Sequence, residues 1–302
     1  MKAKTIKAVL GSIHREFVNS IEDENVRNLV NKDAIITGGA IASMLLGEKV
    51  NDYDYYFRTR ETALAVANYY VGLFNNLNPD FNASEPPSVK EKDGRVIIYI
   101  QSKGVAYDSD LMGEVRYFDH GFRTDELEID LETVVNAIQE SQEIKYKPVF
   151  LSRNAITLDN KIQLVLRFYG EPEEIHDNYD FVHCTNYYLP FEHKLVLNPN
   201  ALESLLTKEL KYMGSKYPIC SVIRTRKFVK RGWGINAGQY LKMCFQISEL
   251  DLTNFDVLEE QLIGVDTYYF QQIIQILREK QEKDPGFKLD ANHLAVIIDK
   301  IF

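Results

Sequence analysis

The sequence predicts an α+β protein in which a mixed β-sheet domain flanked by helices is followed by an all-α C-terminal domain. Short apolar runs rich in β-branched and aromatic residues alternate with helix-like segments up to about residue 195, and the pattern is helical from about residue 198 onward. An apolar content of 45% in 302 residues is enough to build a substantial core. We therefore predict a sheet domain over residues 1–195 and a helical domain over residues 196–302.

The N-terminal part alternates helices with short strands. Apolar residues at helical spacing predict three helices, at residues 4–31, 40–46 and 61–77. The apolar run AIIT at 34–37 and the alternating, aromatic-rich DYDYYF at 52–57 predict strands. Residues 78–94 are rich in Pro, Asn, Ser and Gly, which predicts a loop.

The middle and C-terminal parts follow the same change from strands to helices. Apolar and alternating runs predict strands at residues 96–101, 115–118, 148–152, 155–158, 162–168 and 181–188. A helix is expected over 131–142. In the helical domain, Pro218 marks the first turn of a helix, Gly232 lies just past its end, and Asn236 opens the next helix.

Several classes of protein are excluded by simple counts. No apolar run approaches the roughly 18–20 residues of a membrane span, and the charged start MKAKTIKAVLGSIHREF is unlike a signal peptide. We therefore expect an intracellular protein with no membrane partner. The three cysteines show no CxxC spacing, which indicates reduced thiols and argues against a zinc site or a disulfide framework. The sequence contains no G-x-S-x-G turn and no paired Cys/His context, so a nucleophilic triad is not predicted.

The segment ITGGAIASMLLGEKVNDYDYYF contains the residues most informative about function. Residues two apart in a strand share a face, so Asp52 and Asp54 project together, and paired carboxylates suit a divalent cation such as Mg²⁺ or Mn²⁺. Gly38 and Gly39 have no side chains, so phosphate oxygens can approach the backbone N–H groups at the start of the next helix. A metal ion and a phosphate group would then be neighbours.

The order of glycine pair, short helix and Asp-x-Asp strand resembles the nucleotidyltransferase superfamily related to DNA polymerase beta. The stretch GGAIASMLLGEKVNDYDYYF is particularly similar to the head motif of bacterial poly(A) polymerases and CCA-adding enzymes. It departs from that group at Ala42 and Ser43, where those enzymes usually have Arg-Asp, which puts CCA addition itself in question.

The resemblance implies a nucleotidyltransferase-type sheet domain and transfer of a nucleoside monophosphate from an NTP, with Mg²⁺ or Mn²⁺ held by three carboxylates. Asp52 and Asp54 are the first two catalytic and metal-binding candidates. Asp180 is the preferred third, because it precedes the apolar run FVHC, which is expected to pair beside IQLVLRF. Asp130 is the alternative, followed by Asp108 or Asp110, and a turn role for Asp180 stays open.

Positive charge is concentrated in one segment of an acidic chain. The formal net charge is −9, yet residues 206–231 hold eight Lys and Arg residues and a single acid, Glu209. On a helix, Arg224, Lys227 and Arg231 share one stripe. These three residues and Lys208 are candidates for binding the nucleotide or the backbone of an acceptor. Gly38 and Gly39, with Ser43 in the helix after them, are the other candidates for binding the nucleotide. A solvated helix face is the simpler alternative.

The second half of the chain is also similar to nucleotidyltransferase-like proteins encoded by tailed bacteriophages, which implies action in a bacterial host cytoplasm. An RNA 3′ end, with tRNA as one possibility, is the preferred acceptor because of the basic segment and the head motif. The alternatives are a protein hydroxyl, a small molecule such as an aminoglycoside, and a non-catalytic phage protein that keeps the fold to bind a nucleotide or partner. The sequence carries no information on the oligomeric state.

Overall fold

The computed structural model describes residues 1–79, 85–92, 94–100 and 145–261, with isolated positions further on. The chain divides into two compact units, the first holding the described residues up to Thr207 and the second those from Lys208 onward. The predicted strand at 115–118, the predicted helix at 131–142 and the candidates Asp108, Asp110 and Asp130 lie outside the described residues.

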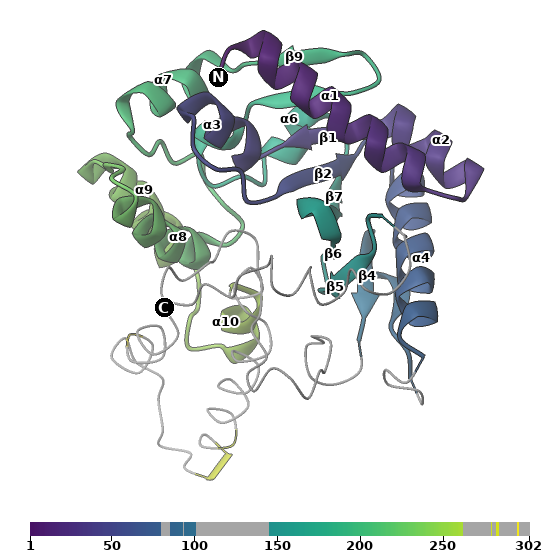
Figure 1. Cartoon of the computed structure of the whole chain (residues 1–302). Helices are drawn as coiled ribbons and strands as arrows, with labels where there is room; N and C mark the ends of the chain where they lie inside the picture. The colour runs from purple at the N-terminus through teal and green to yellow at the C-terminus, as the bar shows by residue number, and fades with distance from the viewer. Residues whose placement is uncertain are drawn as a thin grey trace, which may run out of the picture. The chain divides into compact units, whose positions relative to one another are not determined.

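The first unit is a seven-stranded mixed sheet with helices on both faces, in the strand order β5-β6-β7-β2-β1-β8-β9 (Figure 1). Its strands are β1 (Ala34–Thr37), β2 (Tyr53–Phe57), β5 (Pro148–Leu151), β6 (Ala155–Leu158), β7 (Ile162–Tyr169), β8 (Tyr187–Leu189) and β9 (Lys194–Val196). Its helices are α1 (Ala3–Ser20), α2 (Glu24–Asp33), α3 (Gly39–Leu46), α4 (Arg60–Leu77), α6 (Pro172–His176) and α7 (Pro199–Thr207), with short 3-10 turns at Asp159–Lys161 (η1) and Val182–Cys184 (η2). The α+β class predicted from the sequence is confirmed.

The helix expected over residues 4–31 is two helices, α1 and α2. Ile21 adopts an extended backbone after α1, and the side chain of Asp23 accepts a hydrogen bond from the Val26 N–H at the start of α2. This N-cap satisfies one of the backbone donors that a new helix leaves open, so the chain can turn without losing helical periodicity.

The loop expected over residues 78–94 contains a strand. β3 (Ser88–Lys92) pairs antiparallel with β4 (Arg95–Tyr99) to form a separate two-stranded sheet. Gly94 lies between them with φ 71°, a backbone conformation that glycine adopts without strain. The polar sequence SVKEK hid this strand because its residues are mostly exposed.

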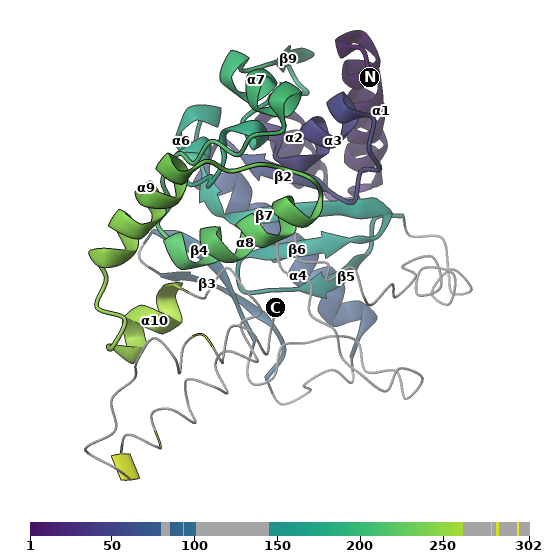
Figure 2. The same cartoon turned by 90° about the vertical axis from the view of Figure 1, so that its left-hand side faces the viewer.

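One face of the large sheet carries the main hydrophobic core. Alternate residues of β2, including Tyr55 and Phe57, join Ile36 of β1 and Leu164 of β7 on this face. They pack against apolar side chains from α1, α2, α3 and α4, and α4 runs along the sheet (Figure 2). Because strand residues alternate between faces, the residues between these point the other way.

The opposite face has a smaller apolar cluster beneath α6. Ile35, Tyr56, Val165 and Leu189 meet Ile175 of α6, and the partly buried Tyr179 and Tyr187 pack against them. This second face is therefore apolar beneath α6. The candidate functional residues lie on the same face, two residues away along each strand.

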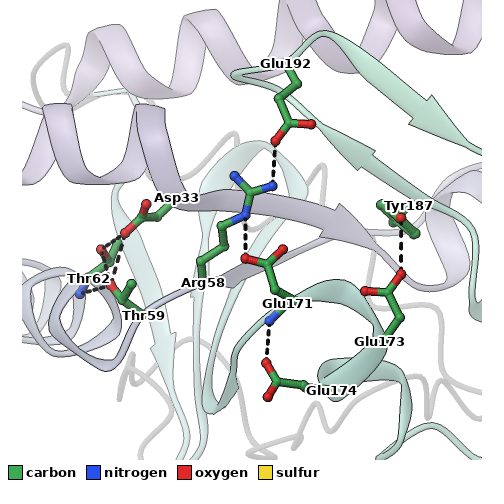
Figure 3. Close-up of polar contacts among 9 residues, drawn as sticks. All are labelled: Asp33, Arg58, Thr59, Thr62, Glu171, Glu173, Glu174, Tyr187 and Glu192. Carbon is green, nitrogen blue, oxygen red and sulfur yellow. Dashed lines mark hydrogen bonds and ion pairs between the residues drawn. The ribbon is translucent and has the colours of Figure 1, made fainter.

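Polar contacts fix the far end of β2 and the helices that follow it (Figure 3). The buried Asp33 carboxylate accepts hydrogen bonds from the hydroxyls of Thr62, at 2.6 Å, and Thr59, at 3.0 Å. Arg58 lies between Glu192, at 2.6 Å, and Glu171, at 3.3 Å, and Glu171 forms a capping box with Glu174 at the start of α6. These contacts join β2, α6 and the turn before β9.

The second unit is helical over its described residues, with α8 (Pro218–Lys230), α9 (Ala237–Ser248) and α10 (Phe255–Gln261). α8 packs against α9 and α10. Pro218 opens α8, Gly232 follows its end with φ 79°, and Asn236 is the N-cap of α9, as the sequence predicted. Among the described residues, no helix combines the length and apolar character needed to cross a membrane.

Candidate functional site

A row of polar side chains crosses the centre of the sheet on the face opposite the main core. Strand pairing places Thr157 opposite Gln163, Gln163 opposite Asp54, Asp54 opposite Thr37, and Thr37 opposite Tyr187. These five residues, which we call the polar row, come from β6, β7, β2, β1 and β8. Directly opposite residues of paired strands share a face, so the row gathers chemistry that is far apart in the sequence.

Gly38 forms a cradle for the carboxylate of Asp54. Gly38 has φ 88° and is the N-cap of α3, and a Cβ atom built on it would lie 2.5 Å from Oδ2 of Asp54. Any larger residue would collide with that carboxylate and would also strain the backbone. The carboxylate, the glycine bend and the N-terminus of α3 therefore lie together, and Gly39 has open space around it.

The electrostatics of Asp54 favour a positive charge beside its carboxylate. Burial, and then the negative charge of Asp52, raise the pKa of Asp54 well above its ordinary value. Asp52 directly precedes β2, is partly exposed, and is close enough for its charge to act on Asp54. A divalent cation between the two would remove the repulsion.

A buried histidine holds the neighbouring end of β1. The Thr37 hydroxyl donates to the carbonyl of Asn186 at 2.9 Å and lies 2.8 Å from Nε2 of His176. Burial lowers the pKa of His176 to about 4, so its ring is neutral at physiological pH and shares a hydrogen bond with Thr37 through Nε2. Because these bonds occupy its hydroxyl, Thr37 serves as a support for the glycine bend.

Tyr179 places an aromatic ring beside this support. Its ring centroid lies 5.0 Å from that of His176 and 6.0 Å from that of Tyr56. Burial, followed by the proximity of Tyr56 and Asp54, raises the pKa of Tyr179 well above its ordinary value, so the phenol stays protonated. The Tyr187 hydroxyl, at the end of the polar row, donates to Glu173 of α6 (Figure 3).

The strand expected over residues 181–188 is wrong, and with it the argument that placed Asp180 beside β7. Residues Val182–Cys184 form the 3-10 turn η2, which the Thr185 hydroxyl stabilises by donating to the Val182 carbonyl at 2.7 Å. Only Tyr187–Leu189 is a strand, and it pairs with β1 and β9. Asp180 is 7% exposed and lies between α6 and η2.

The residue opposite Asp54 on β7 is Gln163, which the sequence analysis did not single out. It is 7% exposed, and its side-chain oxygen has no hydrogen-bond partner among the described residues. The available signal was one polar residue inside the apolar run IQLVLRF. No group of three or more His, Cys, Asp or Glu side chains within the described ranges is arranged to hold a metal ion.

The donor set around Asp54 nevertheless suits a hard divalent cation. Two carboxylates at spacing two and a buried amide oxygen without a partner are oxygen ligands of the kind that Mg²⁺ and Mn²⁺ prefer. The Asp54 carboxylate fills the space at Gly38, and the open space at Gly39 would let a phosphate group approach the start of α3. The residues present therefore fit a metal ion with a nucleotide phosphate.

The other candidate residues lie in two places. Ser43 is half-buried in α3, and Ala42 beside it is buried. In the second unit, Lys208 is exposed with φ 50°, Arg224 and Lys227 are half-buried on α8, and Arg231 is exposed at its C-cap. Arg226 and Lys230 form the more exposed stripe, whereas Tyr212 and Trp233 are buried core residues.

Comparison with known protein families identifies one match over most of the first unit. The family model described as "Gabija anti-defense 2 family protein" matches residues 9–208. A relative from Bacillus phage SPbetaL7, "Gabija anti-defense 2", is 19% identical over 269 residues, which are 88% of this chain and 49% of the relative. This chain thus spans about half the length of that relative.

Solved structures with some similarity include two CCA-adding enzymes. The Thermotoga maritima enzyme complexed with tRNA gives a TM-score of 0.40 at 11% identity, covering 92% of this chain and 57% of the enzyme. The Bacillus stearothermophilus enzyme in complex with CTP gives a TM-score of 0.40 at 11% identity, covering 86% of this chain and 50% of the enzyme. The resemblance to phage-encoded proteins stated from the sequence has a counterpart in the phage relative.

Proposed function

Because the chain belongs to the Gabija anti-defense 2 family, we propose that it is a phage protein that acts against a bacterial defence, and that it does so as a metal-dependent nucleotidyltransferase. The observation that carries the proposed chemistry is the contact between Gly38 and Asp54. A carboxylate with a raised pKa lies against the bend that opens α3, and a second carboxylate, Asp52, is two residues away. This arrangement suits a bound cation and a nucleotide phosphate side by side.

The residues of the first unit would have distinct tasks in the reaction. Asp52 and Asp54 hold the divalent cation, and the N–H groups at the start of α3, reached through Gly38 and Gly39, bind phosphate oxygens. When bound, Mg²⁺ or Mn²⁺ supplies charge stabilisation to the triphosphate and to the attacking hydroxyl. The net change is a new phosphodiester between the acceptor oxygen and the α-phosphorus of the NTP, with loss of pyrophosphate. The protein contributes position and electrostatics rather than a nucleophile.

For the acceptor, we propose an RNA 3′ end in the host cytoplasm. Support comes from the exposed cations of the second unit, Lys208, Arg226, Lys230 and Arg231, because guanidinium and ammonium groups bind a phosphate backbone. In this proposal the sheet domain carries out the transfer and the helical domain holds the acceptor.

The experiment is a transfer assay with the purified chain. Each α-labelled NTP is incubated with Mg²⁺ or Mn²⁺ and with host RNA or host protein, and the labelled fraction is identified. We expect label in RNA from the wild type, and none from Asp52→Asn. Glu61→Gln, which changes an exposed acid in the first turn of α4, is the matched control and should keep wild-type transfer. Label in protein alone would replace RNA by a protein hydroxyl as acceptor.

A non-catalytic nucleotide-binding protein is the second candidate. Ala42 and Ser43 replace the Arg-Asp of the resembling enzymes, and the described residues hold no three-acid metal group. This candidate predicts NTP binding with no transfer to RNA, protein or a screen of small molecules. Binding that is equal in the wild type and in Asp52→Asn, without any transfer, would favour it over the enzyme.

A further inference from the structure

Gln163 is a buried acceptor that the fold leaves unsatisfied. Its side chain is 7% exposed, and its oxygen has no hydrogen-bond partner among the described residues. An unpaired buried acceptor destabilises a protein by about 1–3 kcal/mol, a cost that a ligand bound to it would offset. The rest of β7 on the opposite face, Ile162, Leu164 and Leu166, is fully apolar and buried.

The position of Gln163 defines which ligand fits. Gln163 and Asp54 are direct partners in the parallel pair β2–β7, where neighbouring strands lie about 4.8 Å apart. Thr37 is the partner of Asp54 on the other side, and its hydroxyl is already bonded to Asn186 and His176. Of the two strand partners of Asp54, Gln163 is therefore the one whose side-chain oxygen can still accept a bond.

Two adjacent oxygen acceptors attract a cation rather than another acceptor. An amide oxygen is a suitable ligand for Mg²⁺ and Mn²⁺, and it adds no negative charge to the site. With Asp52 and Asp54 ionised, the ligands of the protein carry two negative charges, which balance one divalent ion. A second ion would need further anionic ligands, and no third acid joins these two among the described residues.

We infer that Gln163 Oε1 is a neutral third ligand of the cation held by Asp52 and Asp54, so that these three residues together hold one divalent ion. This inference rests on the proposed function for the identity of Asp52 and Asp54 as ligands. It assigns to Gln163 the place that the sequence analysis gave to Asp180, and it makes the site less negative than a three-carboxylate site.

The test is a titration of the whole chain with Mn²⁺. Calorimetry measures the heat of binding, and electron paramagnetic resonance measures the Mn²⁺ that stays free. We expect one bound ion in the wild type and roughly ten-fold weaker binding in Gln163→Met, which keeps the length of the side chain without its oxygen. Gln163→Glu adds a charged ligand and should bind Mn²⁺ roughly ten-fold more tightly, a change of about 1.4 kcal/mol. Glu61→Gln, which changes the exposed acid in the first turn of α4, is the matched control and should bind as the wild type does.

Three outcomes would overturn the inference: two Mn²⁺ ions per chain, wild-type affinity in Gln163→Met, or a larger loss in Asp180→Asn than in Gln163→Met. Urea denaturation shows whether each variant is folded, and Gln163→Glu keeps the test decisive if Gln163→Met does not fold. Nucleotide transfer combined with any of these outcomes leaves the proposed function standing without the inference. One Mn²⁺ ion that depends on Gln163, combined with no transfer to any acceptor, supports the inference and removes the enzyme.

Discussion

The two faces of strand β2 show how one short segment serves two purposes. Tyr55 and Phe57 are 0% exposed and pack into the main core, whereas Asp54, between Tyr53 and Tyr55, faces Gly38 with a raised pKa. Burial is favourable for the aromatic rings and unfavourable for an ionised carboxylate. The comparison teaches that stability is concentrated on one face, and that the other face keeps a carboxylate whose burial is unfavourable, as the proposed function expects of a group that binds a ligand.

The sharpest way to break the comparison is Asp54→Asn. We expect nucleotide transfer to fall at least about 1,000-fold, equivalent to about 4 kcal/mol, because a cation ligand is lost. The metal-free protein should be more stable than the wild type, since a buried like-charge partner of Asp52 is removed. Transfer rates and urea denaturation without metal measure both effects. Lower stability together with unchanged transfer would assign Asp54 to the structural face.

On the core face, Phe57→Ala should destabilise the fold by about 3–5 kcal/mol, because it removes a fully buried ring and leaves a cavity. The measurement is the free energy of unfolding in urea. Phe57→Leu, which keeps most of the volume, is the control and should lose less. If the alanine variant unfolds at the wild-type urea concentration, this face is not the stabilising one.

The pH dependence of stability tests the core face through His14, whose ring stacks on Tyr55 at a centroid distance of 6.0 Å. Burial lowers the pKa of His14 to about 4, so the native state resists a proton that the unfolded chain accepts below about pH 6.5. Stability should therefore fall as the pH falls from about 6.5 to 4, and His14 alone should account for about 2 kcal/mol at pH 5.

His14→Phe should remove the contribution of His14 to the pH dependence of stability. The similar contribution of His176 should remain, because burial also lowers the pKa of His176 to about 4. Urea denaturation of the wild type and the variant at pH 5 and pH 7 measures the difference. An equal loss of stability in both proteins between the two pH values would contradict the assignment to His14.

The smallest effect is expected at the far end of β2, where Arg58 contacts Glu192 and Glu171. Glu192→Gln should lower the free energy of unfolding by less than about 1 kcal/mol, since both acids are partly exposed and Glu171 remains in contact with Arg58. The difference should shrink further at high salt, which urea denaturation at two ionic strengths would reveal. A loss of several kcal/mol would show that this end of the strand organises α6 as well.

Local chemistry made parts of both units predictable. The glycine bend, α3, β2 and the ends of α8 were predicted because each is marked by residues next to one another in the chain. β3 was missed because its polar residues are stabilised by pairing with β4, and the break between α1 and α2 because Asp23 lies within a continuous periodicity. The pairing of β3 with β4 depends on geometry that a local pattern does not contain, whereas the Asp23 cap joins residues three apart and is a local signal that the periodicity masked.

For the candidate site, Asp52 and Asp54 could be proposed from their spacing alone, but Gln163 could not. Its place beside Asp54 depends on the register of the parallel pair β2–β7, whose strands are separated by about a hundred residues of intervening chain. A sequence pattern indicates which face of its own strand a residue occupies, and it does not indicate which residue lies opposite. The misplaced strand after Asp180 has a different cause, because the Thr185 hydroxyl donates to the Val182 carbonyl and favours a 3-10 turn there.

The fit between Gly38 and Asp54 also restricts how this protein can change over time. A side chain at Gly38 would meet Oδ2 of Asp54 at 2.5 Å, so the two positions are not free to vary independently. If a lineage loses Asp54 first, position 38 gains room for a side chain. The left-handed backbone still disfavours residues other than glycine there. In homologous chains we therefore expect loss of the aspartate to precede loss of the glycine, which makes a retained glycine beside a lost aspartate the mark of a recently silenced site.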